Sequence, residues 1–298
     1  MNRTQGWTEY PNDRFKETEY YSLSSGISEL DSMLCGGARR NELFVIASRP
    51  SSGNKMLALK MALREASCGM NVLYLVRRGV NDDYMAERLW RMLFGNAKPG
   101  DEPTINGTYD GMLSQRWNLC SELPLIIERS GYPKIELIAS LIKEMAERHY
   151  AKTVVIDDIR DLLPQQTPIT LNKESQWRLI GEQLRILAHS CRTVIVCCDL
   201  EPDSEYRMGQ GFPPMLCDVD RRFQLDYYAD TIINIWRPEM YGFYPDSFNN
   251  KTGMCYIDVV KNARDIYGQI VVSWDDLYNC TNLPGAMSHK DDYEDDLP

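Results

Sequence analysis

The stretch ELFVIASRPSSGNKMLALKMA, residues Glu42–Ala62, decides the fold. It begins as a short apolar strand, passes through a loop of small residues and continues as the apolar-periodic start of a helix. Phosphate-binding loops have this arrangement, with the pattern Gly-x-x-x-x-Gly-Lys-Ser/Thr placed between a strand and a helix. The stretch therefore predicts a strand–loop–helix unit built like a phosphate site.

The loop departs from that pattern at two positions. Asn54 stands where the lysine belongs, and Lys55 stands where the hydroxyl that holds Mg²⁺ belongs. Lys55 comes one residue late, so on a helix it points about 100° away from the usual direction of the lysine. The small residues that let backbone N–H groups approach a phosphate are kept, so we expect a loop of normal shape that binds ATP weakly. The candidate nucleotide-binding residues are Arg49, Pro50, Ser51, Ser52, Gly53, Asn54, Lys55 and Met56.

Outward from this unit, apolar strands alternate with helical patterns. Further strands are expected at 71–76, 123–128, 153–158 and 193–198. Helices are expected at 54–70, 83–93, 133–149 and 175–191. Buried strands between helices indicate a mostly parallel sheet covered on both faces. Three late runs without intervening helices predict an antiparallel edge, at 230–236, 254–260 and 269–274. The expected fold class is α/β.

The composition limits the class of protein. The chain has 298 residues, 43% of them hydrophobic, which is enough for a sizeable core. No apolar run approaches the roughly 18 residues of a membrane span, and the polar start is unlike a signal peptide. The net charge of −10 argues against a protein that coats nucleic acid, because that task needs clustered Lys and Arg. Nine cysteines without metal-ligand spacing indicate reduced thiols, so we expect a cytoplasmic protein without membrane contact.

The run TVVIDD supplies a candidate metal ligand. Asp157 follows four apolar residues and is expected at the carboxyl edge of the sheet, where ligands bind. In a phosphate-loop protein, a carboxylate at this place holds Mg²⁺ through water. The alternative is that Asp157 and Asp158 only cap the strand, and the motif alone leaves both interpretations open.

Longer segments resemble the ATPase domain of DnaB-type replicative helicases. They are SSGISELDSMLCGGARRNELFVIASRPSSGNKMLALKMA, LPLIIERSG, TVVIDDIRDL, YYADTIINIWRPE and DVVKNARDIYGQIVVSW, in the family's order. The resemblance covers roughly residues 24–275 and implies a RecA-like P-loop NTPase fold that uses ATP and Mg²⁺. It also implies a homo-oligomer, a ring or a filament, that contacts single-stranded DNA and replication or mobile-element proteins.

The sequence divides the chain into three expected parts, of which the central one carries the resemblance. An N-terminal extension at 1–21 precedes a DnaB-like RecA-type domain at 22–280, and an acidic, disordered tail follows at 281–298. The end of the tail, DDYEDDLP, resembles the partner-binding tails of single-stranded-DNA-binding proteins but lacks their final aromatic residue. The alternative is a tail that only increases solubility.

Two departures from the family fall on the groups that act on the γ-phosphate. Arg78 stands where the family carries the glutamate that activates water, and a cation cannot serve as that base. Asp199 stands where the family carries the glutamine that senses the γ-phosphate. Both positions are therefore substituted family positions rather than candidate catalytic residues.

A further departure concerns the group that would act on the neighbouring subunit's nucleotide. The family's Lys-x-Arg becomes Lys261, Asn262 and Ala263, so the arginine is lost or displaced to Arg264. Lys261 and Arg264 are the candidate subunit-interface residues. ATP hydrolysis needs these groups together with the lysine and hydroxyl of the loop. The sequence therefore predicts a retained scaffold with lost or heavily weakened hydrolysis.

The family's DNA-binding loops lie between the strands expected at 193–198 and 230–236. The candidate DNA-binding residues here are Arg207, Arg221 and Arg222. The same stretch carries the carboxylates of Glu201, Asp203, Glu205, Asp218 and Asp220. This acidic balance predicts at most weak contact with single-stranded DNA, and a solvated surface loop is the alternative.

Three functional hypotheses remain open from the sequence. The first is an assembly or docking protein that oligomerises within a replication or mobile-element machine without turning over ATP. The second is an active ATP-dependent helicase motor with an unusual phosphate loop. The third is a nucleotide-sensing module that binds a ligand and changes its partners.

Overall fold

The structure is a computed structural model of the chain. It describes residues 22–76, 80, 85, 88–89, 91–92, 123–129, 142–144, 146–162, 173–189, 193–243 and 253–280. The expected extension at 1–21 and the tail at 281–298 lie outside the described residues, as does Arg78. Many residues of the helices expected at 83–93 and 133–149 also lie outside the described residues.

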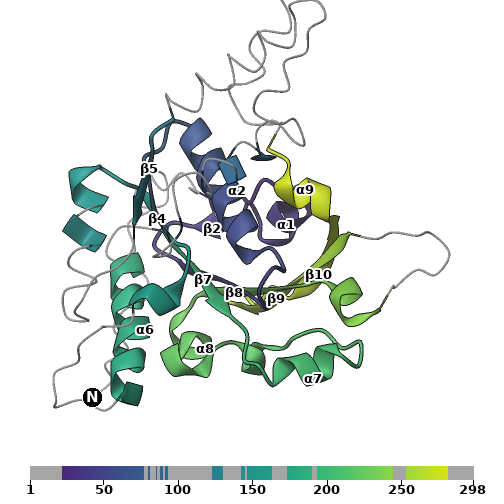
Figure 1. The fold of residues 1–298 in the computed structure, drawn as a ribbon. Helices are drawn as coiled ribbons and strands as arrows, with labels where there is room; N and C mark the ends of the chain where they lie inside the picture. The colour runs from purple at the N-terminus through teal and green to yellow at the C-terminus, as the bar shows by residue number, and fades with distance from the viewer. Residues whose placement is uncertain are drawn as a thin grey trace, which may run out of the picture.

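Within the described residues, the main sheet has eight strands in the order β10-β9-β8-β3-β7-β6-β4-β5. They are β3 (Leu43–Ser48), β4 (Val72–Val76), β5 (Leu125–Arg129), β6 (Thr153–Ile156), β7 (Thr193–Asp199), β8 (Thr231–Trp236), β9 (Met254–Asn262) and β10 (Gly268–Ser273). The strands from β8 to β5 pair in parallel, and β9 and β10 extend β8 as an antiparallel edge (Figure 1). The predicted mostly parallel sheet with its antiparallel C-terminal edge is confirmed.

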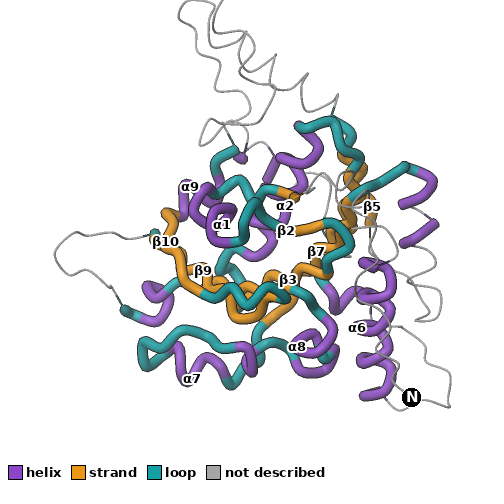
Figure 2. The backbone as a smooth tube through the Cα atoms, turned by 180° about the vertical axis from the view of Figure 1, so that it is seen from behind, coloured by secondary structure: helices purple, strands orange, loops and turns teal. Residues whose placement is uncertain are grey.

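Helices cover both faces of this sheet, as Figures 1 and 2 show. One face carries α1 (Ser28–Met33), α2 (Asn54–Ser67) and α9 (Trp274–Tyr278). The other face carries α6 (Lys173–His189), α7 (Ser204–Met208) and α8 (Leu225–Tyr228). The connections contain short 3-10 helices, η2 (Ile159–Leu162), η3 (Leu216–Asp218), η4 (Arg221–Phe223) and η5 (Pro238–Tyr241). A separate two-stranded ladder joins β1 (Ser22–Leu23) to β2 (Ala38–Arg39). Among the described residues, no helix has the length and apolar character needed to cross a membrane.

The pleat of the strands sorts the apolar side chains into two cores. In β3, Phe44 and Ile46 pack with the side chains of α2, while Val45 and Ala47 pack in the core that contains α6. All residues of β3 are consequently buried. A strand buried on both faces has a continuous apolar run rather than an alternating one, which is why the sequence pattern identified it.

The strand order brings the candidate site residues to one edge of the sheet. β7 lies between β3 and β6, and all three strands run in the same direction. Their carboxyl ends therefore lie side by side, and the register places Ser48 of β3 opposite Asp199 of β7. Asp157 directly follows β6 at the same edge. Ligands bind at this edge in open α/β sheets.

Candidate functional site

The loop between β3 and α2 makes a tight turn that requires glycine at its last position. Gly53 has a φ of 110°, a conformation that side chains with a Cβ rarely adopt. A Cβ placed there would lie 2.5 Å from Cδ2 of Leu277 and 3.1 Å from the ring of Trp274. The N–H groups of Met56 and Leu57 both donate to the Gly53 carbonyl at 3.0 Å and start the helix. Helix α9 is thus packed directly against the loop.

Asn54, which the sequence pattern places where the family's lysine is expected, is held against the sheet. Its amide nitrogen Nδ2 donates to the carbonyl oxygen of Cys198 at 3.1 Å, and its Oδ1 accepts the Lys55 N–H at 2.9 Å. The residue is only 6% exposed. Because both ends of the amide are engaged within the chain, Asn54 does not substitute for a lysine that reaches a phosphate.

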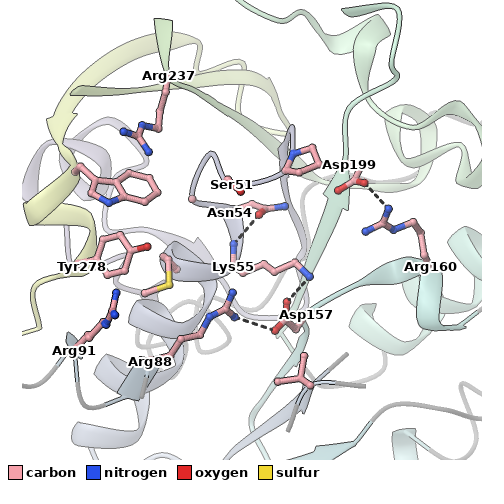
Figure 3. Close-up of a pocket in the computed structure, with 15 residues that line it drawn as sticks. Ser51, Asn54, Lys55, Arg88, Arg91, Asp157, Arg160, Asp199, Arg237 and Tyr278 are labelled. Atoms are coloured by element: carbon pink, nitrogen blue, oxygen red, sulfur yellow. Dashed lines mark hydrogen bonds and ion pairs between the residues drawn. The ribbon is translucent and has the colours of Figure 1, made fainter. Parts of the chain in front are cut away.

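Lys55 points to the carboxylates at the end of β6. Its Nζ lies 3.1 Å from Oδ1 of Asp157 and 3.4 Å from Oδ2 of Asp158 (Figure 3). Nη1 of Arg88 approaches the other oxygen of Asp157 at 3.6 Å. Burial disfavours the ammonium, but the two carboxylates outweigh it and raise the pKa of Lys55. Lys55 therefore stays charged at neutral pH and neutralises the side chain expected to hold Mg²⁺.

A second set of ion pairs fixes Asp199. Arg160 donates from Nε to Asp158 at 2.8 Å and from Nη2 to the same carboxylate at 2.5 Å. Its Nη1 lies 2.6 Å from Oδ2 of Asp199. Burial raises the pKa of Asp199, with Arg160 acting against it. Asp199, the last residue of β7, is thus paired with an arginine of its own chain.

These contacts test whether a divalent cation fits the site. Mg²⁺ prefers a near-octahedral set of oxygen ligands. Asp157 offers two oxygens, but Lys55 and Arg88 already lie against them, and no hydroxyl side chain stands at position 55. Among the described residues, no group of three or more His, Cys, Asp or Glu side chains has metal-binding geometry. The residues around Asp157 therefore do not fit Mg²⁺.

A cavity of about 710 Å³ opens beside the loop. Its charged lining residues are the cations Lys55, Arg88, Arg91, Arg160 and Arg237 and the anions Asp157 and Asp199. Asp158 lies beside Lys55 and Arg160, and Glu239 is paired with Arg237, so with these two carboxylates included five cationic side chains face four anionic ones, although the chain as a whole carries −10. The remaining excess of one positive charge gives the cavity a modest electrostatic preference for anions.

Aromatic side chains form one wall of the cavity, on the left of Figure 3. The rings of Trp274 and Tyr278 meet edge to face with centroids 4.8 Å apart. The guanidinium carbon of Arg237 lies 4.0 Å from the centroid of the Trp274 ring, a cation–π geometry. This wall comes from α9 and from the residue that follows β8, so it joins distant parts of the chain at the loop.

The sequence pattern did not identify several of these lining residues. Arg160 and Arg237 follow β6 and β8, so their position after strands was a usable signal. Trp274 and Tyr278 gave no such signal, because they reach the cavity only through the antiparallel edge. Arg88 lies in a segment where the sequence predicted a helix without a role.

The two candidate interface residues are engaged within the chain. Nζ of Lys261 donates to the carbonyls of Asp226 and Tyr227 at 2.8 and 3.1 Å. Arg264 donates from Nη1 to the Leu34 carbonyl at 2.6 Å. The pairing of β9 with the start of β8 places both at the edge of the sheet opposite the loop. The neighbouring Ala263 has no side chain that could act on a phosphate.

The three candidate DNA-binding arginines also have partners in the chain. Arg207 makes a two-pronged contact with Asp218, at 2.9 and 3.0 Å. Arg222 pairs with Asp220, with Nη2 to Oδ2 at 2.5 Å. Nε of Arg221 donates to the Cys217 carbonyl at 3.1 Å. The stretch between β7 and β8 thus neutralises most of its own positive charge.

Comparison with known proteins identifies relatives of the whole described region. A family model, the DnaB-like helicase C terminal domain, matches residues 22–280. The chain is 24% identical over 284 residues to the replicative DNA helicase DnaB of Rickettsia conorii, covering 86% of this chain and 56% of that protein. It is 21% identical over 260 residues to the replicative DNA helicase DnaC of Bacillus subtilis, covering 86% and 55%. The chain thus spans a little over half the length of these curated relatives.

Solved structures share the fold. One is a DnaB-like replicative helicase whose structure was described with its interactions with primase; it has a TM-score of 0.72 and 22% identity, over 90% of this chain and 64% of that one. Another was described as an ATPase domain, with a TM-score of 0.71 and 22% identity, over 89% of this chain and 93% of that one. At this level of identity the likeness establishes a common architecture.

Proposed function

Because the chain belongs to the DnaB-like helicase C-terminal domain family, we propose that it serves DNA replication or mobile-element DNA processing without being a motor. In this proposal ATP hydrolysis is lost or strongly weakened, and the protein acts as an oligomeric assembly or docking component. The role is assigned to the domain at 22–280, flanked by the extension at 1–21 and the acidic tail at 281–298.

The observation that carries the proposal is the ion pair between Lys55 and Asp157. Phosphoryl transfer by a phosphate-loop protein depends on a loop lysine at the β- and γ-phosphates and on Mg²⁺ held by a loop hydroxyl and a strand-end carboxylate. Here the loop's own lysine lies 3.1 Å from that carboxylate. The lysine is therefore turned away from its catalytic place, and the carboxylate is engaged.

Two further contacts support the same conclusion. The Asn54 amide is bound to the Cys198 carbonyl at 3.1 Å, so it offers no charge to a phosphate. Asp199 is paired with Arg160 at 2.6 Å. Catalytic groups of this kind act as a unit, so the loss of several leaves little of the rate enhancement.

The proposed partners follow from family membership. One structural relative was described with its interactions with primase, and we extend partnership with replication or mobile-element proteins to this chain as part of the proposal. A homo-oligomer, as a ring or a filament, belongs to the same proposal. Contact with single-stranded DNA is expected to be weak, because Arg207 and Arg222 are already paired with Asp218 and Asp220. ATP and Mg²⁺ are the family's cofactors. We expect this site to accept the anionic nucleotide and not the metal ion.

Phosphate release by the purified full chain, with and without single-stranded DNA, tests the loss of hydrolysis. We expect release equal to a protein-free blank in both conditions. The double variant Asn54→Lys with Lys55→Thr restores the loop pattern and is expected to stay inactive, because Arg78, Asp199 and Ala263 remain substituted. Steady turnover stimulated by single-stranded DNA would establish the active helicase motor instead.

Light scattering of the same preparation tests the assembly role. We expect particles larger than one chain over a range of concentrations, with or without ATP. A monomer at every concentration would contradict an oligomeric scaffold. In that case the third hypothesis, a nucleotide-sensing module, would be favoured by one specific observation, the anion-preferring cavity beside the loop.

A further inference from the structure

The ammonium of Lys55 occupies the place between the loop and the strand-end carboxylates. Phosphate-loop proteins hold their divalent cation between a loop hydroxyl and such a carboxylate. Here the residue in the hydroxyl's place spans the same gap, with Nζ 3.1 Å from Asp157 and 3.4 Å from Asp158. Figure 3 shows its side chain extended toward Asp157, with Arg88 approaching the same carboxylate. The positive charge at this place is therefore supplied by the chain itself.

A metal ion would have to displace that charge. The Asp157 side chain is 1% exposed and that of Lys55 is 21% exposed, so a displaced ammonium would remain largely out of water and lose the shorter of its two carboxylate contacts. Removing one partner from a buried ion pair is strongly unfavourable. The site is thus built to keep Lys55 and to exclude a divalent cation.

The rest of the cavity is suited to a multiply charged anion. Arg91 and Arg237 line it together with Lys55 and Arg88, and Arg237 is also paired with Glu239. The N-terminus of the 14-residue helix α2 opens into the same space, since Gly53 and Asn54 are also lining residues. Guanidinium groups bind phosphate oxygens through charge-assisted, often two-pronged hydrogen bonds. Phosphate groups are therefore the ligand chemistry that this lining fits.

We propose that the cavity binds an oligophosphate anion in its metal-free form, as a free nucleoside triphosphate, with the Lys55 ammonium as a built-in counter-cation. This inference deepens the proposed function because it concerns the same site, and it assigns that site a static ligand in place of a turned-over substrate. The aromatic wall of Trp274 and Tyr278 provides ring faces for a base. An inorganic oligophosphate shares the anion chemistry but makes no use of that wall.

Isothermal titration of the full chain with ATP, in EDTA and in excess Mg²⁺, tests the proposal. We expect binding in EDTA at least as tight as binding in Mg²⁺. Titration with Mg²⁺ alone is expected to give no binding heat. Affinity about tenfold or more higher in Mg²⁺ would overturn the proposal, as would the absence of ATP and tripolyphosphate binding in both conditions.

Matched variants separate the charge from the fold. Lys55→Arg keeps a cation and should retain metal-independent binding, whereas Lys55→Thr frees Asp157 and should make binding stronger in Mg²⁺ than in EDTA. Arg91→Gln should weaken ATP and tripolyphosphate alike, while the exposed Arg148→Gln should change neither. Circular dichroism confirms that each variant is folded. Metal-independent binding by a folded Lys55→Thr variant would overturn the role assigned to Lys55.

Tripolyphosphate distinguishes the two sources of the anion. Tighter binding of ATP than of tripolyphosphate, lost in Trp274→Ala, supports a nucleotide; equal binding of the two overturns the nucleoside assignment. Failure of the inference is distinguishable from failure of the proposed function. Absent binding with absent turnover overturns only the inference, whereas ATP turnover by the wild-type chain overturns the proposed function itself.

Discussion

Strands β3, β6 and β7 supply apolar side chains to two cores along their length and lead into charged side chains at their carboxyl ends. Along the strands, side chains such as Phe44 and Val155 are fully buried among other apolar groups. At the ends, Asp157 and Asp199 are paired with Lys55 and Arg160. The sheet has the architecture of the DnaB-like family, and its carboxyl edge holds charged side chains that pair within the chain.

The difference shows that architecture and chemistry depend on separate residues. Packing requires apolar side chains of suitable volume at every buried position of a strand, so it leaves little freedom. The charges at the edge need only to be balanced, and many sets of partners achieve that. A sheet can therefore keep its fold while the charged groups at its carboxyl edge change.

The largest expected effect comes from a substitution in the strand interior. Phe44→Ala removes a fully buried ring from the core beneath α2 and leaves a cavity. We expect a loss of about 3–5 kcal/mol in the free energy of unfolding, measured by urea denaturation. Tyr206→Ala, at a side chain that is 78% exposed, is the matched control and should change stability by less than about 0.5 kcal/mol. Equal losses in the two variants would contradict the assignment of the core.

Much of the interior, but little of the edge, is predictable from the sequence. Continuous apolar runs in the sequence predicted β3, β6 and β7, because strands buried on both faces carry apolar residues at successive positions rather than at alternate ones. The loop was found through its glycine and serines. The pairing of Lys55 with Asp157 was not predicted, because it joins side chains that lie about a hundred residues apart in the sequence. The position of Lys55 on its helix predicted only that its side chain points away from the usual direction of the loop lysine, and did not identify the carboxylate that it contacts.

A smaller effect is expected at the edge. Lys55→Thr removes the ammonium from Asp157, which then keeps only the longer contact with Arg88 at 3.6 Å. We expect a loss of about 2 kcal/mol in the free energy of unfolding, less than for a fully buried pair because Lys55 is partly exposed. Adding Asp157→Asn should cost less than the sum of the two single variants, as a double-mutant cycle measures.

The control for this cycle is an ion pair of the same type on the surface. Lys143 and Glu147 are four residues apart and 3.8 Å from each other, with both side chains more than half exposed. Lys143→Thr should change stability by only about 0–0.5 kcal/mol. An additive result for Lys55 and Asp157 would show that their contact does not contribute to the fold.

The smallest expected effect concerns a buried carboxyl group away from the edge. Glu65 lies on α2, is 5% exposed, and has an oxygen without a hydrogen-bond partner among the described residues. Burial raises its pKa to about 7 from an ordinary value of 4.5. The folded chain therefore holds this proton more tightly than the unfolded chain does. The resulting stability is fully present below pH 4.5 and is lost as the pH rises through about 7.

Glu65→Gln removes this dependence, because the amide stays neutral. Above pH 7 we expect the variant to be more stable than the wild type by about 1–2 kcal/mol, and near pH 4.5 the two should be equal, as measured by urea denaturation across that range. Asp157 differs in its partners: burial raises its pKa as well, but Lys55 and Arg88 oppose that rise, so the gain in stability above pH 7 should be smaller for Asp157→Asn than for Glu65→Gln. A Glu65→Gln variant that loses stability at pH 8 would indicate that Glu65 is ionised and paired in the fold. The distinction between the interior carboxyl group of Glu65 and the cation-paired carboxylate of Asp157 would then be lost.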